Sequence, residues 1–176
     1  MFRVKGLQGT LAAAALVVAL MGVSPSPAAA QTSDADVINA IALVVGIAPL
    51  NVTGVNDLQF GSVTAGSVGT IADPAANGGR WDVTGEPSAA VSVAFTLPTV
   101  LTGPGGSIPI SFSATDGLNW TSFPTTFTTF NPNALLSTTL TGAGTLTIGI
   151  RGSVSPALGT TTGTYTGTIT LTVSYL

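Results

Sequence analysis

The chain has 176 residues, with four lysines and arginines, seven aspartates and glutamates, and no cysteine or histidine. Its formal net charge of −3 excludes a basic surface for nucleic acid, and the lack of cysteine excludes a disulfide framework. Because histidine and cysteine supply many catalytic bases, nucleophiles and metal ligands, we expect no enzymatic activity, no cofactor and no metal site.

Residues 1–30 are typical of a secretion signal. A short positively charged start is followed by residues 11–23, an apolar stretch shorter than the roughly 20 residues that a membrane-spanning helix needs. Residues 28–30, all alanine, supply the small side chains that a signal peptidase requires before Gln31. We therefore expect cleavage at Gln31 and a secreted single domain that does not span a membrane. An uncleaved N-terminal anchor is the alternative.

The expected mature N-terminus, residues 31–48, begins with a polar segment and continues as an apolar run from residue 37. Alternate positions of this run carry bulky side chains, which is the pattern of a strand with one apolar face; they are Val37, Ile41, Leu43, Val45 and Ile47. Pro49 ends the pattern because proline has no N–H group for a ladder hydrogen bond. The run is either the first strand of its own domain or a donor strand that pairs with the edge of another subunit.

Residues 49–176 are patterned as a β-sandwich domain. Glycine, proline and threonine recur too often for helix interiors, so we expect no helix. Short alternating segments are separated by turns rich in glycine and proline, which indicates an all-β sandwich. The strands expected in the first part of this domain are residues 57–63, 80–84, 89–97, 108–114, 127–130 and 135–140.

Four aromatic side chains lie in or beside a stretch rich in threonine and proline. They are Trp120, Phe123, Phe127 and Phe130. If these rings are exposed in a loop, they form an adhesive surface for glycans. The alternative is that they fill the core, as most large apolar side chains do.

The longest alternation is at the C-terminus. From Tyr165 to Tyr175, aromatic and aliphatic residues occupy one face and hydroxyl residues the other, which predicts a strand of eleven residues with a fixed register. Leu146, Ile148 and Ile150 alternate in the same way. Because turn residues separate these two segments, we expect them to be neighbouring strands.

Four short motifs follow one another along the chain. They are Asp57-Leu58-Gln59-Phe60-Gly61, the stretch from Trp81 to Pro87 that leads into residues 91–97, Gly144-Thr145-Leu146-Thr147-Ile148, and Gly163-Thr164-Tyr165-Thr166-Gly167 with the strand after it. In this order they resemble motifs of a bacterial secreted family, the domain of unknown function 4402 family, which has no established activity. That family is similar in design to chaperone–usher pilins and spore-coat-type domains. The resemblance implies an incomplete immunoglobulin-like sandwich that a neighbour's N-terminal extension completes.

On this resemblance, residues 37–47 are the donor strand. The C-terminal strand helps to form the acceptor through Tyr165, Ile169, Leu171, Val173 and Tyr175. We therefore expect a non-enzymatic structural subunit of an extracellular fibre or surface layer. It would pass through the periplasm to a bacterial cell surface and associate with copies of itself or with related subunits. The alternatives are a monomeric adhesion module that binds surface glycans and a small outer-membrane β-barrel.

Overall fold

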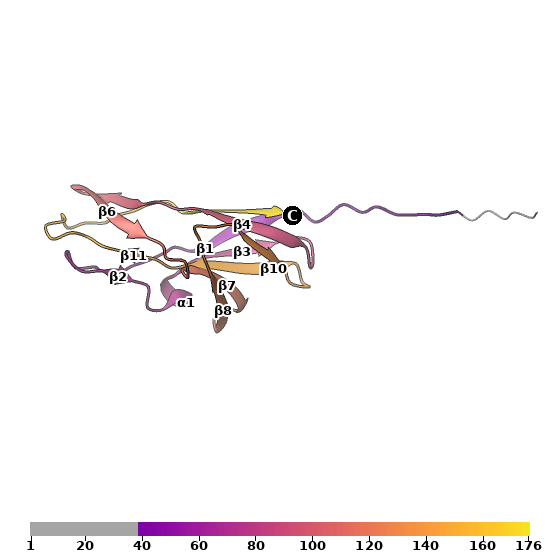
Figure 1. The fold of residues 1–176 in the computed structure, drawn as a ribbon, viewed down its shortest axis with the longest axis horizontal. Coiled ribbons are helices and arrows are strands. Elements are labelled where there is room, and N and C mark those ends of the chain that lie inside the picture. The colour runs from indigo at the N-terminus through magenta and orange to yellow at the C-terminus, as the bar shows by residue number, and fades with distance from the viewer. Residues whose placement is uncertain (1–38) are drawn as a thin grey trace, which may run out of the picture. The chain divides into compact units, whose positions relative to one another are not determined.

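The computed structural model describes residues 39–176; residues 1–38, which include the expected secretion signal and Val37, lie outside the described part. Val44–Leu176 form one unit. It is built almost entirely of β-strands, and every strand pair in it is antiparallel (Figure 1). The predicted all-β sandwich is therefore confirmed.

The strands form three sheets. The first has five strands in the order β1-β3-β10-β7-β8, with bounds Asn51–Asn56, Gly79–Thr84, Thr145–Ile150, Gly117–Ser122 and Thr126–Phe130. The second has four strands in the order β2-β11-β6-β5, with bounds Gly69–Thr70, Ser153–Val154, Gly106–Ser111 and Val100–Gly103. The third has three strands in the order β12-β4-β9, with bounds Thr170–Tyr175, Ala90–Thr96 and Leu136–Thr139.

The first core lies between the five-stranded and the three-stranded sheets, because both supply its buried side chains. Val83 of β3 and Ile148 of β10 come from one sheet, and Val91 and Val93 of β4 with Leu171 of β12 come from the other. The four valine and isoleucine side chains among them are at most 1% exposed. Burial of each contributes roughly 1.5–3 kcal/mol, so this core is the main source of stability.

The second core is smaller and lies toward the other end of the unit, where β2, β6 and β11 gather (Figure 1). Its buried residues are Ile108, Ile110 and Val154. The apolar side chains around them are only partly buried; they are Leu58, Phe60, Val63, Leu101, Phe112 and Tyr165. The second core is therefore less completely covered than the first.

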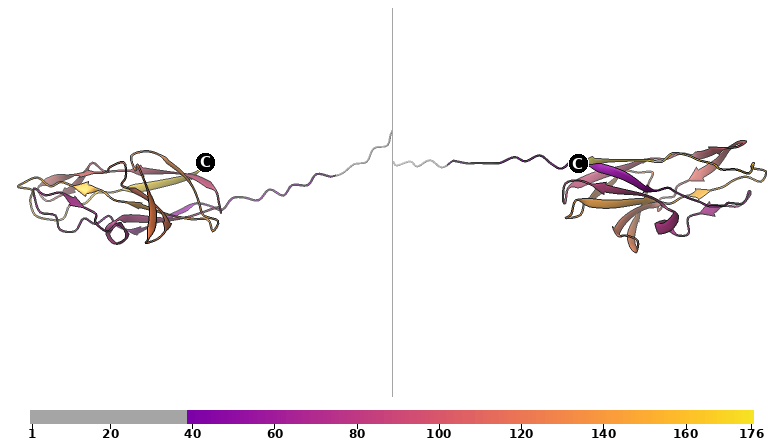
Figure 2. Two further views of the ribbon diagram at one scale, coloured as in Figure 1. Left: turned by 60° about the horizontal axis from the view of Figure 1, so that its bottom comes forward. Right: turned by 180° about the vertical axis from the view of Figure 1, so that it is seen from behind.

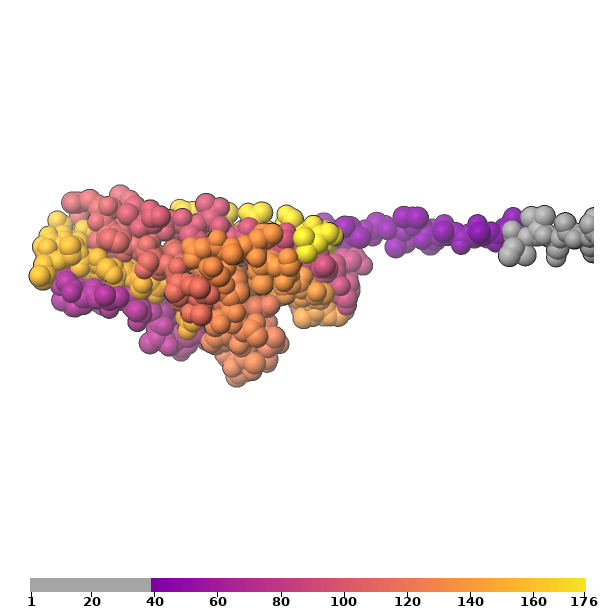
Figure 3. Space-filling model, in the orientation of Figure 1, coloured from indigo at the N-terminus to yellow at the C-terminus, as the bar shows by residue number. Residues whose placement is uncertain are grey.

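The hairpin of β7 and β8 projects from the unit (Figures 2 and 3). Trp120 packs edge-to-face against Phe123 and Phe127, with ring centroids 5.0 Å and 4.7 Å away. The Arg80 guanidinium carbon lies 4.1 Å from the centroid of the Phe123 ring. These contacts brace the hairpin against β3, the strand that carries Arg80.

One short helix, α1 (Pro74–Asn77), contradicts the expectation of a helix-free domain. Asp73 caps it, because the Asp73 side chain accepts hydrogen bonds from the N–H groups of Ala75 and Ala76. Pro74 stands at the first helical position, where its missing N–H group costs nothing. A single turn has too few residues for a periodic apolar pattern, so periodicity did not reveal it.

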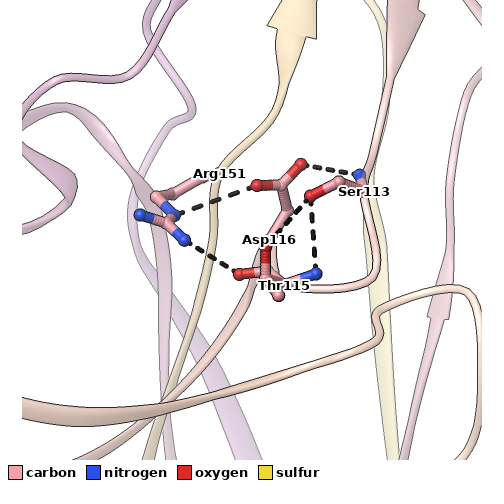
Figure 4. A network of polar contacts seen from close by, with 4 residues as sticks. All are labelled: Ser113, Thr115, Asp116 and Arg151. Atoms are coloured by element: carbon pink, nitrogen blue, oxygen red, sulfur yellow. Dashed lines mark hydrogen bonds and ion pairs between the residues drawn. The ribbon is translucent and has the colours of Figure 1, made fainter.

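Arg151 joins the turn between β6 and β7 to the end of β10 (Figure 4). Its guanidinium donates a hydrogen bond of 2.9 Å to the Thr115 carbonyl oxygen, and its Nε atom lies 3.9 Å from Asp116 Oδ1. Asp116 Oδ2 in turn accepts a hydrogen bond of 2.7 Å from the Ser113 N–H group. A partly exposed pair of this kind contributes at most about 1 kcal/mol. We interpret this cation as structural.

Three predictions about strands are wrong. Residues 57–63 belong to no strand, and the C-terminal strand β12 begins at Thr170 rather than at Tyr165. Strands β10 and β12 lie in different sheets instead of pairing. The alternation in these segments reflects burial of one face, but burial does not require a hydrogen-bonded partner strand. The sequence patterns also did not predict β1, β2, β5, β7 and β11.

Candidate functional site

The N-terminal extension, which we define as residues 39–47, is apolar and carries bulky aliphatic side chains on alternate positions. None of its residues belongs to a strand of the described chain. The side chains of Ile41, Leu43, Val45 and Ile47 are 91%, 89%, 74% and 65% exposed. Residues 44–47, which belong to the same unit as the sandwich, therefore add no strand to it. Val37, the fifth candidate donor residue, lies outside the described part.

The extension ends at an anchor around Ala48. The Tyr175 hydroxyl donates a hydrogen bond of 2.6 Å to the Ala48 carbonyl oxygen and accepts one of 2.6 Å from the Glu86 N–H group. The Ala48 N–H group donates one of 2.8 Å to Glu86 Oε2. Both backbone groups of Ala48 are thus bound to the domain, so the chain leaves it at a fixed point.

A cleft of about 910 Å³ opens over the second core, between residues 56–65 and residues 160–169. We call these segments the two walls. Ile108, Ile110 and Val154 contribute its apolar floor. Asp57 is the only charged residue among the described residues that line it. One isolated carboxylate does not make the pair of carboxylates that glycoside hydrolysis uses.

The segments that continue from the two walls meet on both sides of the cleft, beyond the walls themselves. At one end the Gly66 N–H group donates a hydrogen bond of 2.8 Å to the Pro156 carbonyl oxygen. At the other end the chain before β1 meets the end of β12 through Ala48 and Tyr175. Among the described residues, no backbone hydrogen bond links residues 57–65 with residues 157–174. The walls run in opposite directions, because the start of one faces the end of the other.

The wall of residues 160–169 turns backbone groups toward the cleft. Both backbone groups of Thr166 bond to Thr102 of β5, at 2.9 Å and 2.8 Å. Successive residues of an antiparallel ladder direct their N–H and C=O groups to opposite sides. The backbone groups of Tyr165 and Gly167 therefore face away from β5, toward the cleft.

The opposite wall follows the same rule. The Gln59 N–H group donates a hydrogen bond of 2.9 Å to the Asn77 carbonyl oxygen at the end of α1. The N–H groups of its neighbours Leu58 and Phe60 have no backbone partner in the part of the chain that the structure describes. In an extended segment they point away from α1. Both walls thus present sheet-edge groups that a further strand can pair with.

Two of the four sequence motifs meet at this cleft. Residues 57–61 lie in one wall and residues 163–167 in the other. The glycines of the second motif let it pack closely, since a Cβ atom at Gly167 would lie 2.8 Å from a Leu101 methyl carbon. Between them, the Tyr165 hydroxyl lies 2.7 Å from the Pro104 carbonyl oxygen. The glycine–tyrosine–glycine pattern is therefore explained by close packing against β5 and the turn that follows it.

The structure divides the candidate acceptor residues between two places. Tyr165 and Ile169 line the cleft. Leu171 is buried in the first core, and Val173 and Tyr175 pack against that core. Sequence reasoning missed Leu101, Ile108, Ile110 and Val154 as cleft residues. The alternation of Ile108 and Ile110 indicated a buried face, but nothing in the pattern showed that this face lines a cleft.

The four candidate adhesive residues do not form one exposed surface. Trp120 is buried at 6% exposure, whereas Phe123 is 41% exposed. Phe127 packs on Trp120, and Phe130 stacks against Phe95 at the edge of the first core, with centroids 6.2 Å apart. Phe123 is the most exposed of the four, and its ring also contacts Trp120 and Arg80, so the four residues provide little exposed aromatic surface for a glycan.

Comparisons with known proteins return no match: no protein-family model and no curated protein is similar to this chain. The resemblance to the domain of unknown function 4402 family thus rests on the four motifs alone. Within residues 39–176, no helix has the length and apolar character needed to cross a membrane.

Proposed function

We propose that this protein is a non-enzymatic, secreted structural subunit of a bacterial extracellular fibre or surface layer. Subunits assemble by β-strand addition, in which residues 37–47 of one copy pair with a neighbouring subunit. The motifs that resemble the domain of unknown function 4402 family support the same role.

The exposure of the extension is the observation that carries this proposal. Four bulky aliphatic side chains on alternate positions are left in solvent. Burial of each contributes roughly 1.5–3 kcal/mol, so a partner that covers all four gains about 6–12 kcal/mol before the cost of ordering the segment. Ladder hydrogen bonds add about 1 kcal/mol each. This free energy is large enough to hold subunits together without disulfides.

The low charge of the chain favours the same interpretation. Only 6% of its residues are charged, against roughly 25% in typical soluble domains. An isolated soluble domain normally relies on surface charge to stay monomeric. A surface that neighbouring subunits partly cover has less need of it.

The test compares residues 31–176 with a variant that begins at Ala48, by size-exclusion chromatography and negative-stain electron microscopy. We expect fibres or ladders of oligomers from the longer protein and a monomer from the shorter one. Retaining Ala48 preserves the anchor at Tyr175. If the longer protein stays monomeric, or the shorter one still forms fibres, the proposal that subunits assemble through this extension is wrong.

A matched pair of point variants sharpens the test. Leu43→Asp places a carboxylate on the bulky face of the extension, and Ala42→Asp places the same charge one residue away on the other face. Because burying an unpaired carboxylate is very costly, we expect Leu43→Asp to abolish assembly and Ala42→Asp to retain it. Equal assembly by the two variants would contradict the proposed use of the bulky face.

A further inference from the structure

We infer that the cleft over the second core is the site that receives the extension, and that its occupant is residues 39–47 of a second copy of this chain. This inference rests on the proposed function and adds to it the receiving site. It differs from the acceptor expected from the sequence, because only Tyr165 and Ile169 of that set line the cleft.

The backbone of the cleft is suited to an inserted strand. Tyr165 and Gly167 face it from one wall, and Leu58 and Phe60 from the other, each with an N–H group that lacks a backbone partner in the described chain. A strand between the walls would pair with both. Since the walls run in opposite directions, it is antiparallel to one and parallel to the other.

The dimensions of the extension match the cleft. The extension, residues 39–47, is one residue shorter than the wall of residues 56–65. A strand rises about 3.3 Å per residue, so an inserted extension can follow this wall along its length.

The side chains of the extension also suit the cleft. On one face Ile41, Leu43, Val45 and Ile47 can cover Ile108, Ile110 and Val154, which completes the second core. The opposite face is small apart from Val44, with alanine or glycine at positions 40, 42 and 46. The extension carries no charged residue, so nothing opposes its burial electrostatically.

A second copy, rather than the chain's own extension, is the occupant. Ala48 is held by Tyr175 and Glu86, beyond the end of the cleft. The residues just before it in the same unit, Val44, Val45 and Ile47, are 91%, 74% and 65% exposed. In a single copy residues 44–47 therefore leave the cleft unfilled, and each copy offers both a strand and a site.

Disulfide trapping tests this assignment, because the natural chain contains no cysteine and every thiol is introduced. The acceptor begins at Ala48 and carries Thr164→Cys, an exposed position in a cleft wall. Three donors carry Ala40→Cys, Ala42→Cys or Val44→Cys on the outward face of the extension. The control acceptor carries Thr128→Cys, an exposed position on the distant strand β8. All cysteines avoid the apolar floor, so folding of the acceptor is retained.

After mild oxidation, we expect the donor–acceptor disulfide to be at least tenfold more abundant with the Thr164→Cys acceptor than with the Thr128→Cys acceptor. Among the three donors, we expect one position to give the highest yield of this disulfide. Equal trapping at both acceptor positions would overturn the assignment. Absent trapping at Thr164→Cys while residues 31–176 still form fibres would also reject the cleft but leave the proposed function standing. Absent trapping together with absent fibres would reject both.

Discussion

Gly144, in the turn between β9 and β10, has a backbone conformation that only glycine adopts easily. Its φ is 72°, and a Cβ atom there would overlap the carbonyl oxygen of Gly85. The Gly85 N–H group also donates a hydrogen bond of 2.8 Å to the Gly144 carbonyl oxygen. The neighbouring Gly142 has no atom within 4 Å of its Cβ position. The turn therefore has room for a side chain at Gly142 but not at Gly144.

We predict that Gly144→Ala lowers the free energy of unfolding by at least about 2 kcal/mol, because a left-handed conformation and a backbone overlap add together. Gly142→Ala should change it by no more than about 0.5 kcal/mol. Urea denaturation of the variant that begins at Ala48 measures both without interference from assembly. Similar losses for the two substitutions would show that the close approach of this turn to Gly85 is not as described.

Residue patterns predicted burial better than they predicted pairing. The inward positions Leu171, Val173 and Tyr175 were identified from alternation, and all three belong to or pack on the first core. The aromatic residues were harder to place, because Trp120 and Phe123 are close in sequence but differ sharply in exposure. The local composition around both residues is the same, so their difference in exposure arises only from the fold of the hairpin.

At the scale of elements, the joint between β12 and the extension depends on one hydroxyl group. We predict that Tyr175→Phe lowers the free energy of unfolding by about 1–3 kcal/mol, since it removes two hydrogen bonds of about 0.5–1.5 kcal/mol each. It should also speed proteolysis near Ala48. Chemical denaturation of the variant that begins at Ala48 and limited proteolysis of residues 31–176 give the two readouts. Ser174→Ala, an exposed change on the same strand, is the control; a loss no greater than in this control would contradict the anchor.

Two of the wrong strand predictions share one physical cause. Residues 57–63 and 165–169 alternate as strands do, yet the walls that contain them have only isolated backbone bonds, such as Gln59 to Asn77 and Thr166 to Thr102. Alternation reports which face is buried, but a strand also needs a partner edge. On the inference above, both segments lack the same partner, the extension of another copy.

At the scale of the whole molecule, the two cores differ in completeness. The first is enclosed by two sheets, whereas the second consists of three buried residues beneath a cleft. The sequence predicted the sandwich because turn spacing and alternation are local signals. It did not predict the cleft, since the floor residues Ile108 and Val154 come from distant segments that meet only in the fold. Filling the cleft should therefore stabilise the molecule as a whole.

We predict that a synthetic peptide of residues 37–48 raises the Tm of the variant that begins at Ala48. A ligand at a hundredfold its Kd stabilises the folded state by about 2.7 kcal/mol. Each kcal/mol shifts the Tm of domains near this size by roughly 2–8 °C, so the shift should be several degrees and should grow with peptide concentration. The same peptide with Leu43→Asp is the control, because a carboxylate on the bulky face cannot be buried cheaply. Differential scanning calorimetry measures both. An equal shift from the two peptides would indicate non-specific binding, and the absence of any shift would mean that the folded domain has no site for this strand.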